Sequence, residues 1–565
     1  MTRAILGISE ETTSNATLFI DGKPIAAIAQ ERLNRKKFAA GYPDLAIKEV
    51  LKIGGLSLDD VDTIVVSNRF HFIYRLLPGM FKDYEHDFFS IKQKIYLYYH
   101  DLLHKYGFFR YLMGKFNHYL INKRLKRKFI ITDHHTTHAY SAYMTSGFEK
   151  CLAVSIDNMG DGLSCGIFLC EDGKCKQICG VSALYSPGQF YGEITQYLGF
   201  DPLKHAGKIT GLAAYGDSRK AYHLMEKLIS YDESKMSFKM PGLLFKSPGK
   251  GIFKKLNDFS KEDVAAAVQK RLEDVVIEFI LPFLNKTGMT KIALAGGVFG
   301  NVRLNQKIYE LDGIDGIFIH PGMSDCGLSM GAVLMYLAEN ENLKPSELDH
   351  IYLGPSYSES EIKSTLDGYD LTYDKPDECE VEIARLLSKG KVIARFNGSM
   401  EYGPRALGNR SILYQPNDIS VNKWLNEKLK RTEFMPFAPV TMSDHAEECY
   451  KNIKGIEYTA KFMTIAVDCT DFMKKTSPGV VHIDGTARPQ LVSRVDNESY
   501  FRILEEYYKI TGIPGIINTS FNMHEEPIVC SPDDAVRAFL ESRLDYLAIG
   551  PFLVPLPGKM PNKPK

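Results

Sequence analysis

The sequence predicts an α/β protein that is divided into at least two domains. Short apolar runs of strand length alternate with helical segments, which is the pattern of sheets covered by helices. The chain has 565 residues, well past the length at which one hydrophobic core stops growing. Its 44% hydrophobic and 24% charged residues are ordinary for a globular protein, so a mainly disordered chain is excluded.

Composition narrows the classes of partner and location. The chain carries 69 basic and 69 acidic side chains, so its formal net charge of zero gives no electrostatic reason to expect nucleic acid. No run approaches the ~20 apolar residues of a membrane-spanning helix, and no span is expected. The N-terminus lacks a signal-peptide pattern, and ten cysteines are too few for a disulfide scaffold. We therefore expect a reducing, cytoplasmic location.

The N-terminal part begins with strands and continues in an alternating pattern. Asp21-Gly22-Lys23 lies between two apolar runs and predicts a hairpin turn. A helix and a further strand follow, as expected for an α/β sheet. In chain order, the predicted elements are a strand at 4–8, hairpin strands at 16–20 and 24–29, a helix at 44–53 and a strand at 63–66.

Residues 70–128 interrupt this pattern and predict a helical insertion. They are rich in Phe, Tyr, Lys and Arg and show almost no strand periodicity. Three interpretations are open: a packed helical cap, a lid over an acceptor substrate, or a surface that contacts lipid. The basic run at 123–128 suits an anionic surface, although such runs are more often solvated. We favour the cap or lid.

The middle of the chain contains a predicted hairpin and then a domain boundary. Cys170 and Cys175 lie on either side of the hairpin turn. Because the cysteines of this region lack paired CxxC spacing, a zinc ribbon is not expected. The composition changes near 340–356, so we place the boundary there, between domains 1–350 and 351–565.

His134 and His138 predict a metal site. On a helix, their spacing of four residues puts both imidazoles on one face, although a pair alone is more often structural. Two acids strengthen the prediction, because Asp157 ends a strand before a glycine-containing loop and Asp325 lies in another strand-to-helix turn. Two histidines with two carboxylates suit a divalent ion that keeps open positions. His135 points to a different face, so we expect it to be structural.

Two glycine-rich segments suggest backbone that lies close to a ligand. Gly296 and Gly297 follow a strand, and amides at such a turn favour phosphate, with Asn301 as a further donor. Tight packing is the alternative, because the turn is not the spaced dinucleotide fingerprint. The second segment, 204–216, is dense in small residues, and its Lys208 is either an anion ligand or a surface lysine.

A cluster of cations in the last third predicts a site for a highly anionic ligand. Arg405 and Arg410 bracket a glycine-rich turn, and guanidinium groups suit bidentate contacts with phosphate or carboxylate. Each of these side chains alone could instead form a surface ion pair. The further donors are Lys430, Arg431, Arg488 and Asn518.

Together these segments resemble the carbamoyltransferase family that includes the nodulation protein NodU and the enzymes that modify tobramycin and cephamycin. The resemblance runs over nearly the whole chain, and its most specific part is the Gly-Pro-Arg-Ala-Leu-Gly-x-Arg-Ser run at 403–411. It implies an N-terminal Kae-like domain of the actin and heat-shock-chaperone (ASKHA) superfold and a C-terminal YrdC-like α/β domain. The second domain would combine carbamoyl phosphate with ATP into carbamoyl adenylate, and the first would pass the carbamoyl group to a hydroxyl.

The resemblance also implies roles for the candidate residues. The metal, iron with zinc or manganese as alternatives, would be held by His134, His138, Asp157 and Asp325, and Mg²⁺ would accompany ATP. His138, Asp157 and Lys208 are the expected catalytic residues. The expected partner is a small-molecule hydroxyl acceptor such as a sugar, an antibiotic or another secondary metabolite, and a homodimer is left open. The substrate- and nucleotide-binding residues would be Gly296, Gly297, Asn301, Arg405, Arg410, Lys430, Arg431, Arg488 and Asn518.

Three positions depart from the family's pattern. Thr13-Ser14 stand where a His-Asp pair is usual, Phe38 replaces a histidine, and His524-Glu525 replace Arg-Gly. If the missing pair contacts the acceptor or serves as a base, the transfer chemistry or the choice of acceptor differs here. We expect an ATP-dependent O-carbamoyltransferase. Two other functions stay open: a transferase similar to the tRNA threonylcarbamoyladenosine enzymes, against which the neutral charge weighs, and a non-catalytic nucleotide sensor.

Overall fold

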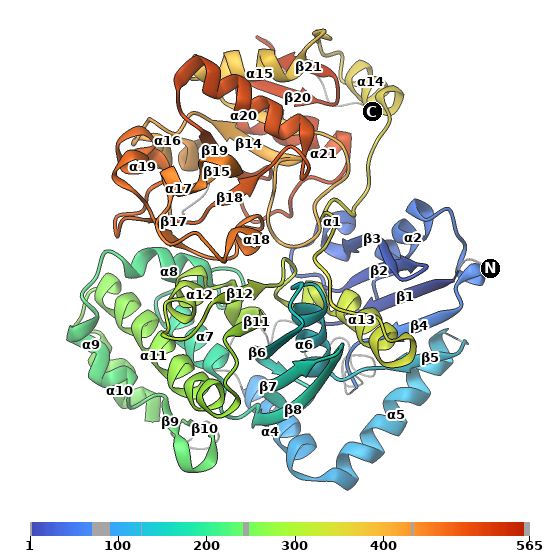
Figure 1. Ribbon diagram of the computed structural model, residues 1–565, viewed down its shortest axis with the longest axis vertical. Coiled ribbons are helices and arrows are strands. Elements are labelled where there is room, and N and C mark those ends of the chain that lie inside the picture. Colours follow the sequence, from blue (N-terminus) through green and yellow to red (C-terminus); the bar gives the residue numbers. More distant parts are fainter. Residues whose placement is uncertain (1–2, 70–90, 126, 241–247, 431–433, 559–565) are drawn as a thin grey trace. The chain divides into compact units, whose positions relative to one another are not determined.

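The structure is a computed structural model, and it describes residues 3–69, 91–125, 127–240, 248–430 and 434–558 (Figure 1). The chain divides into two compact units, each of which contains sheets and helices. The first unit consists of Met1–Pro24, Ala40–Pro43 and Leu56–Glu347. The second unit consists of Ile25–Ala39, Asp44–Gly55 and Leu348–Lys565. The predicted α/β class is thereby confirmed.

The first sheet confirms the strands and hairpin predicted at the N-terminus. Its strands are β1 (Ala4–Ser9), β2 (Asn15–Ile20), β3 (Lys23–Ala29), β4 (Thr63–Val66) and β5 (Phe129–Ile131). Their order is β3-β2-β1-β4-β5, with β1 antiparallel to β2 and parallel to β4. Helix α13 (Leu328–Glu341) packs against β1, β2 and β4, and β1 is buried along its whole length.

The second sheet determines where the candidate metal ligands lie. Its strands are β6 (Lys150–Gly160), β7 (Leu163–Glu171), β8 (Lys174–Ser182), β11 (Lys291–Ala295) and β12 (Gly316–Ile319). The order is β12-β11-β6-β7-β8, in which β6 and β12 run parallel to β11 and β7 is antiparallel to its neighbours. Because parallel strands end at the same edge of a sheet, the residues at the carboxyl ends of β6, β11 and β12 converge there.

Helices of the first unit pack on the second sheet and on one another. α6 (His134–Met144) contacts β6, β11 and α13. The long helix α11 (Lys261–Thr287) begins at the cap Ser260 and ends at Gly288, which has the positive φ usual for a helix end. The remaining elements are α7 (Pro187–Tyr197), α8 (Ala206–Ala213), α9 (Ser218–Met225), α10 (Pro248–Leu256) and α12 (Val302–Tyr309), and the short ladder of β9 (Ser230–Asp232) with β10 (Ser237–Lys239).

The described part of the predicted insertion is helical, as expected. It consists of α4 (Ile91–Lys105) and α5 (Gly107–Leu125), which contact each other, and the prediction for 70–90 falls outside the described residues. Asp101 anchors α4, because its Oδ1 accepts a hydrogen bond of 2.9 Å from the Ser182 hydroxyl on β8. Asn117 anchors α5 by donating to the Arg69 carbonyl at 2.6 Å.

The second unit is built on a mixed sheet in the order β18-β15-β19-β14-β13-β20-β21. Helices α15 (Cys379–Ser388) and α20 (Glu498–Thr511) pack together, and their apolar faces share a buried core with the sheet. The strands are β13 (Ile393–Phe396), β14 (Arg410–Tyr414), β15 (Ala438–Met442), β18 (Gln490–Val492), β19 (Gly515–Ser520), β20 (Tyr546–Ile549) and β21 (Phe552–Pro555). The other elements are α14 (Glu359–Gly368), α16 (Val421–Lys428), α17 (Ala446–Cys449), α18 (Glu457–Ala460), α19 (Asp471–Thr476), α21 (Pro532–Ser542), and the ladder of β16 (Val467–Asp468) with β17 (Thr486–Ala487).

An early segment of the chain belongs to the second unit, which the sequence analysis did not predict. It carries α1 (Gln30–Asn34) and α2 (Asp44–Ile53). Arg35 connects this segment to the C-terminal part of the chain. Its guanidinium donates to the carbonyls of Pro527 and Ile528, both at 2.7 Å, and lies 3.3 Å from Asp534. The later division of the chain falls between Glu347 and Leu348.

Two further features bear on the class of protein. Among the described residues, the helices are either too short or too polar to cross a bilayer.

Cys170 and Cys175 face each other across the β7–β8 hairpin with their Sγ atoms 2.8 Å apart, so the predicted hairpin is confirmed. Both are free thiols.

Candidate functional site

Helix α6 brings the two predicted histidine ligands onto one face. Asp133 caps the helix, because its side chain accepts a hydrogen bond from the Thr136 N–H at 3.3 Å, and α6 begins at His134. The His134 N–H donates to Asp161 Oδ2 at 2.8 Å. One turn further on lies His138, and the two ring centroids are 4.8 Å apart.

The structure brings all four predicted metal ligands together. One ligand atom from each of His134, His138, Asp157 and Asp325 lies within 4.8 Å of every other. His138 Nε2 is 3.3 Å from Asp157 Oδ2 and 3.7 Å from Asp325 Oδ1, and His134 Nε2 is 3.8 and 3.9 Å from the same oxygens. Atoms that each lie about 2.1 Å from one ion are about 3–3.5 Å apart. A divalent ion therefore fits with a small contraction of the cluster.

Unsatisfied polar atoms within this cluster support a metal site. The Nε2 atoms of His134 and His138, which face the two carboxylates, are buried and form no hydrogen bond, and neither does Asp325 Oδ1. Buried polar atoms are normally satisfied, and a shared cation is the simplest partner for nitrogens and carboxylate oxygens that converge on one point. Two imidazoles with two carboxylates suit iron, zinc or manganese.

Backbone amides hold Asp157 in position. Its Oδ1 accepts a hydrogen bond from the Asn158 N–H at 2.7 Å, and its Oδ2 accepts one from the Gly297 N–H at 3.1 Å. The Gly296 N–H donates to the Met323 carbonyl at 2.5 Å. The two glycine amides that we predicted as phosphate donors are thus engaged within the protein, where they orient a candidate metal ligand and its loop.

The charges of the cluster are strongly coupled. Burial disfavours a protonated His134, but the carboxylates of Asp157 and Glu11 raise its pKa well above the ordinary value. Burial acts against an ionised Asp157, yet His134 and His138 hold the pKa of Asp157 well below its ordinary range. Burial and the nearby charge of Asp157 raise the pKa of Asp325 to about 7. An incoming cation must therefore displace protons from the site.

Metal affinity is expected to fall as the pH drops through about 7. The Asp325 carboxyl has a pKa of about 7, so below that pH it is mainly protonated and must lose a proton to act as a ligand. The affinity then decreases by about tenfold per pH unit for each proton displaced. Calorimetric titration with Zn²⁺ on both sides of this pH, in buffers of different ionisation enthalpy, measures the affinity and the protons released. A pH-independent affinity would contradict the assignment of Asp325 as a ligand.

Gly160 is expected to be required for the metal site. A Cβ at this position would lie 2.2 Å from the Cγ and Cδ2 atoms of His134, so Gly160→Ala must displace the imidazole. We expect the Zn²⁺ affinity to fall by roughly 10- to 100-fold. Gly368→Ala, in a helix of the second unit where a Cβ meets open space, is the matched control. Unchanged affinity in a folded Gly160→Ala protein would count against the position of His134 described here.

His135 has a structural role in the described structure, as the sequence analysis expected. Its Nδ1 is 2.8 Å from the Ser155 hydroxyl, and its Nε2 is 3.1 Å from the Leu163 carbonyl. Burial, together with the nearby His134, lowers the pKa of His135 well below its ordinary value. The neutral ring therefore donates from Nε2 to the carbonyl and accepts at Nδ1, which ties α6 to the sheet.

Glu11 is a site residue that the sequence analysis missed. Its Oε1 lies 3.7 Å from His134 Nδ1, whereas the other ring nitrogen faces the candidate metal ligands. A carboxylate beside a metal-binding histidine orients the ring. Asn15 supports the same region by donating to the carbonyls of Thr13 and Asp325, both at 2.8 Å. The available signal was an acid two residues after β1, which is close to the signal that identified Asp157, an acid at the end of a predicted strand.

Asn301 and Lys208 were predicted to lie in loops close to a ligand, but they lie at the start of α12 and within α8. The Asn301 side chain caps α12 and exchanges two hydrogen bonds, of 2.8 and 3.1 Å, with the Gln269 amide, so it is a structural cap rather than a ligand donor. Lys208 is buried in α8. The small residues of 204–216 therefore form mainly a helix, not an open ligand loop.

In the second unit, we call residues 403–411 the arginine loop. Two buried charged side chains, Glu401 and Arg395, form hydrogen bonds with its backbone. Glu401 Oε1 accepts hydrogen bonds of 2.8–3.1 Å from three backbone amides of the loop, those of Leu407, Asn409 and Arg410. The buried Arg395 donates to the Gly408 carbonyl at 2.6 Å. These two charges fix the backbone of the loop, and the sequence analysis identified neither.

Arg410 is a structural residue in this arrangement, which corrects the prediction that it binds phosphate. Its side chain is fully buried, and its guanidinium lies 3.7 Å from the centroid of the Phe396 ring. Both Nη atoms donate to backbone carbonyls, those of Pro355, Asn397, Gly398 and Asn409. The Nη donors that a phosphate would need are therefore already used.

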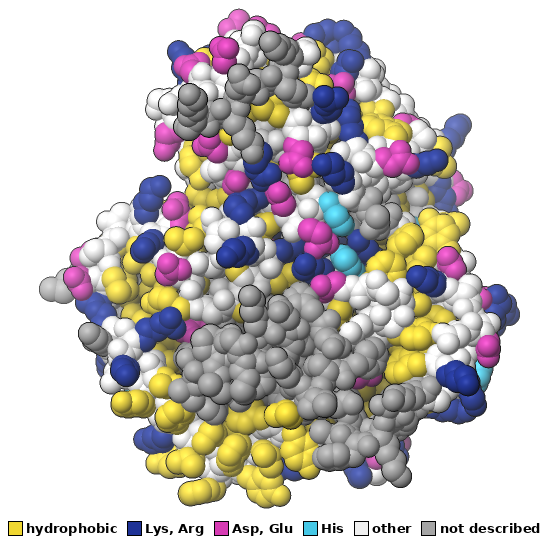
Figure 2. Space-filling view, turned by 180° about the vertical axis from the view of Figure 1, so that it is seen from behind, with side chains coloured by type: hydrophobic (Ala, Val, Ile, Leu, Met, Phe, Trp, Pro, Cys, Tyr) yellow, Lys and Arg dark blue, Asp and Glu magenta, His cyan; other side chains and the backbone are white. Residues whose placement is uncertain are grey.

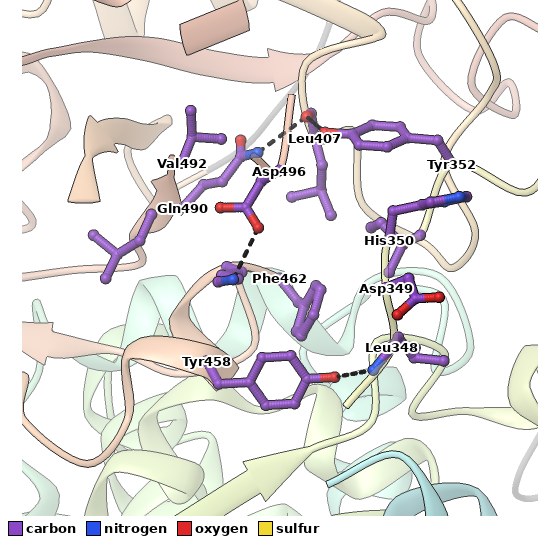
Figure 3. Close-up of a pocket in the computed structure, with 13 residues that line it drawn as sticks. Leu348, Asp349, His350, Tyr352, Leu407, Tyr458, Phe462, Gln490, Val492 and Asp496 are labelled. Carbon is purple, nitrogen blue, oxygen red and sulfur yellow. Dashed lines mark hydrogen bonds and ion pairs between the residues drawn. The ribbon is translucent and has the colours of Figure 1, made fainter. Parts of the chain in front are cut away.

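Gln490 connects the arginine loop to a pocket of the second unit (Figure 3), and Asn518 binds both the loop and Gln490. Asn518 Nδ2 donates to the Ala406 carbonyl at 3.2 Å and to Gln490 Oε1 at 2.7 Å, while Asn518 Oδ1 is buried without a hydrogen bond. Gln490 lines the pocket and donates to the Leu407 carbonyl at 3.0 Å. An ion pair of 2.8 Å between Lys461 and Asp496 contributes to the wall. Asn518 therefore has one acceptor available for a ligand beside the loop.

The remaining cations that were predicted to bind an anion differ from Arg410 in their exposure and contacts. Lys430 is exposed and lies 3.3 Å from Glu541, which matches the surface ion pair that the sequence left open. Arg405 and Arg488 are half-buried, in the arginine loop and in the segment before β18. Arg431 lies outside the described residues.

Two family descriptions each match one part of the chain. The family description Carbamoyltransferase N-terminus matches residues 4–334, and Carbamoyltransferase C-terminus matches residues 384–555. The nodulation protein NolNO of Sinorhizobium fredii is 31% identical over 95% of this chain and 78% of its own, and NolO of Bradyrhizobium diazoefficiens is 35% identical over 75% and 78%. An uncharacterised protein of Methanocaldococcus jannaschii is 31% identical over 97% of this chain and 99% of its own.

Likeness to solved structures is more distant. The (R)-2-hydroxyglutaryl-CoA dehydratase component A of Acidaminococcus fermentans covers 60% of this chain at 15% identity with a TM-score of 0.33. HypF of T. kodakarensis covers 60% at 12% identity with the same TM-score. Scores this low do not establish a shared fold.

The fold and the site define a two-unit α/β transferase with a candidate His/Asp metal centre in its first unit. The two family matches together span most of the chain, and the relatives align over nearly its full length. The chain belongs to the carbamoyltransferase family, and it is an enzyme of that class.

Proposed function

We propose that this enzyme is an ATP-dependent O-carbamoyltransferase that works in two half-reactions. In the first, carbamoyl phosphate loses its phosphate to water, the carbamate oxygen attacks the α-phosphorus of ATP, and pyrophosphate leaves. In the second, an acceptor hydroxyl oxygen attacks the carbonyl carbon of carbamoyl adenylate, AMP leaves, and the hydroxyl proton passes to a base. Activation is needed because the carbamoyl nitrogen donates electrons into the carbonyl, which makes that carbon a poor electrophile.

The proposal assigns one half-reaction to each domain. Domain 1–350, of the Kae-like type with the 70–128 insertion, would transfer the carbamoyl group, and domain 351–565, of the YrdC-like type, would form the adenylate. The observation that carries this proposal is the cluster of His134, His138, Asp157 and Asp325 within the part matched by the family's N-terminal region. An ion centre of this kind has no evident use in the adenylation step, which the arginine loop would serve.

At the proposed transfer site, the four clustered side chains would hold iron, with zinc or manganese as alternatives. When bound, such an ion supplies Lewis-acid polarisation of a phosphate or carbonyl oxygen. Gly297 keeps the Asp157 carboxylate oriented, and Glu11 lies beside the second nitrogen of His134. Lys208 is proposed to neutralise the phosphate of the departing AMP. Its burial in α8 supports this role, because a buried cation attracts anions more strongly than a solvated one.

At the proposed adenylation site, Arg405 and Arg488 would bind phosphate oxygens of ATP, with Mg²⁺ as the accompanying ion. Guanidinium forks match two phosphate oxygens at once. Asn518 Oδ1 would accept a hydrogen bond from the carbamoyl amino group, which is supported by its burial without a protein partner. Lys430 and Arg431 are proposed as additional phosphate ligands, although Lys430 must first leave Glu541.

Pyrophosphate release is the test that separates this function from its alternatives. The full-length protein is incubated with ATP and Mg²⁺, with or without carbamoyl phosphate, and pyrophosphate is measured. Release that requires carbamoyl phosphate supports the proposal. Release that instead requires threonine and bicarbonate would indicate a transferase of the threonylcarbamoyladenosine type. ATP binding without any release would indicate a nucleotide sensor.

The acceptor is proposed to be a hydroxyl of a small molecule such as a sugar, an antibiotic or another secondary metabolite. Family membership supports transfer to some acceptor but does not specify it. Mass spectrometry of candidate metabolites, incubated with the protein, ATP and carbamoyl phosphate, detects the gain of one carbamoyl group. No gain on any hydroxyl compound, combined with gain on a nucleoside, would overturn the choice of acceptor.

A further inference from the structure

Helix α5 exposes the side chains that a surface helix normally buries. Four large apolar or aromatic residues are 48–80% exposed, and their spacing of three, four and seven residues places them on one side: Phe108, Tyr111, Leu112 and Tyr119. The opposite side carries Asn117 and Ile121, which are at most 2% exposed. Helix α2 has the usual arrangement, with Ile47 and Val50 buried. The outer side of α5 therefore carries the apolar residues that an ordinary amphipathic helix turns toward the core.

Neighbouring side chains extend this surface. Ile95 on α4 and Tyr106 between the two helices are each 58% exposed. With the four residues of α5 they form what we call the hairpin face. Figure 2 shows hydrophobic side chains gathered at the lower left, where the α4–α5 hairpin lies. Contiguous exposed apolar groups of this kind usually mark an interaction site.

The charged side chains of the hairpin are almost all positive. Residues 91–128 contain ten Lys and Arg and a single acidic residue, Asp101, in a chain whose total charge is zero. Asp101 is buried and is bound by Lys105 and Ser182, so it offsets one of these ten positive charges. Lys115 lies on the same side of α5 as the aromatic residues and is exposed, as is Lys123 about two turns further on. The surface is both apolar and strongly cationic.

We propose that the hairpin face binds the surface of an anionic lipid bilayer. Aromatic rings settle at the level of the headgroups with their apolar bodies inward, and Lys and Arg extend to the lipid phosphates. The local positive charge adds electrostatic attraction to anionic lipids. A second copy of the chain fits less well, because it would place one basic hairpin against another. This binding is peripheral and does not depend on the proposed carbamoyl chemistry.

Vesicle sedimentation with the full-length protein tests the proposal. The protein should sediment with vesicles of phosphatidylcholine and phosphatidylglycerol, remain in solution with phosphatidylcholine alone, and dissociate as salt is raised. The triple variant Phe108→Ser, Tyr111→Ser, Tyr119→Ser should lose at least about tenfold in affinity. Lys115→Glu with Lys123→Glu should lose binding to the anionic vesicles without change in the aromatic residues.

Matched controls keep this test decisive. Val495→Ser with Ile510→Ser removes apolar groups that are 96% and 53% exposed in the second unit, and binding should not change. Thermal unfolding followed by circular dichroism verifies that each variant is folded. Wild-type protein that stays in solution with anionic vesicles would overturn the proposal, as would an equal loss in the control. If light scattering shows a dimer that the triple variant alone disrupts, and no vesicle binding occurs, the occupant is a second copy instead.

Discussion

Replacing His138 with alanine is expected to abolish metal binding and carbamoyl transfer while pyrophosphate release persists. His138 is fully buried, and its Nε2 is 3.3 Å from Asp157 Oδ2 and 3.7 Å from Asp325 Oδ1. Its loss removes one of four donors and leaves two carboxylates facing each other. We expect at least a 100-fold loss of metal affinity, because losing a direct ligand costs more than the ~10- to 100-fold of an outer partner.

The measurement combines elemental analysis of the dialysed protein with assays of both half-reactions. His223→Ala, on an exposed position of α9, is the control histidine and should change neither. His138→Gln keeps a polar side chain and verifies that the effect does not come from a collapsed cavity. If both half-reactions fail equally in a variant that unfolds like the wild type, the assignment of one half-reaction to each domain is wrong.

Replacing Arg405 with alanine is expected to reduce pyrophosphate release and to leave metal binding intact, the reverse of the result expected for His138→Ala. Pyrophosphate release that depends on carbamoyl phosphate should fall by about 100- to 1000-fold, the usual cost of removing a donor that stabilises developing charge. Metal content should stay unchanged, because Arg405 belongs to the second unit. Arg405→Lys should recover only part of the activity, since an ammonium group cannot make the bidentate contact.

Arg410 provides the contrast within the same loop. Arg410→Ala removes donors from four backbone carbonyls in a buried setting, so it should destabilise the protein by about 3–5 kcal/mol. Thermal unfolding separates the two arginines, because Arg405→Ala should melt close to the wild type. If Arg405→Ala lowers stability as much as Arg410→Ala does, then Arg405 is also structural. If Arg405→Ala is folded and fully active, the proposed phosphate contact is excluded.

The convergence of the four candidate metal ligands could be predicted because local rules determine most of it. The spacing of His134 and His138 has one geometric consequence once the segment is a helix, and Asp133 ensures that the helix begins there. Asp157 lies in β6 just past its pairing with β11, Asp325 comes after β12, and strand ends converge wherever a sheet is parallel. Glu11 obeys the same rule, but without the pairing of the strands it could not be distinguished from other acids after strands.

The candidate anion-binding residues were harder to predict, because whether such a side chain is available to a ligand depends on burial. Arg405 and Arg410 are the same residue type in one glycine-rich loop, yet Arg410 is used by four carbonyls. The amides of Gly296 and Gly297 looked available in the sequence, but they bind Met323 and Asp157. Glu401, which supports the arginine loop, is an ordinary surface acid by sequence.

Local sequence determined the strands, the helices, the family and the side chains of the candidate metal cluster, because period, capping and spacing act over a few residues. Tertiary structure alone decided which polar groups remain available for a ligand, because a hydrogen bond between distant segments can occupy any of them. It also decided that the segment around Arg35 joins the second unit, through bonds to Pro527 and Ile528 far along the chain. The exposure of Phe108 and its neighbours is likewise a property of packing, since the same aromatic helix could have been buried.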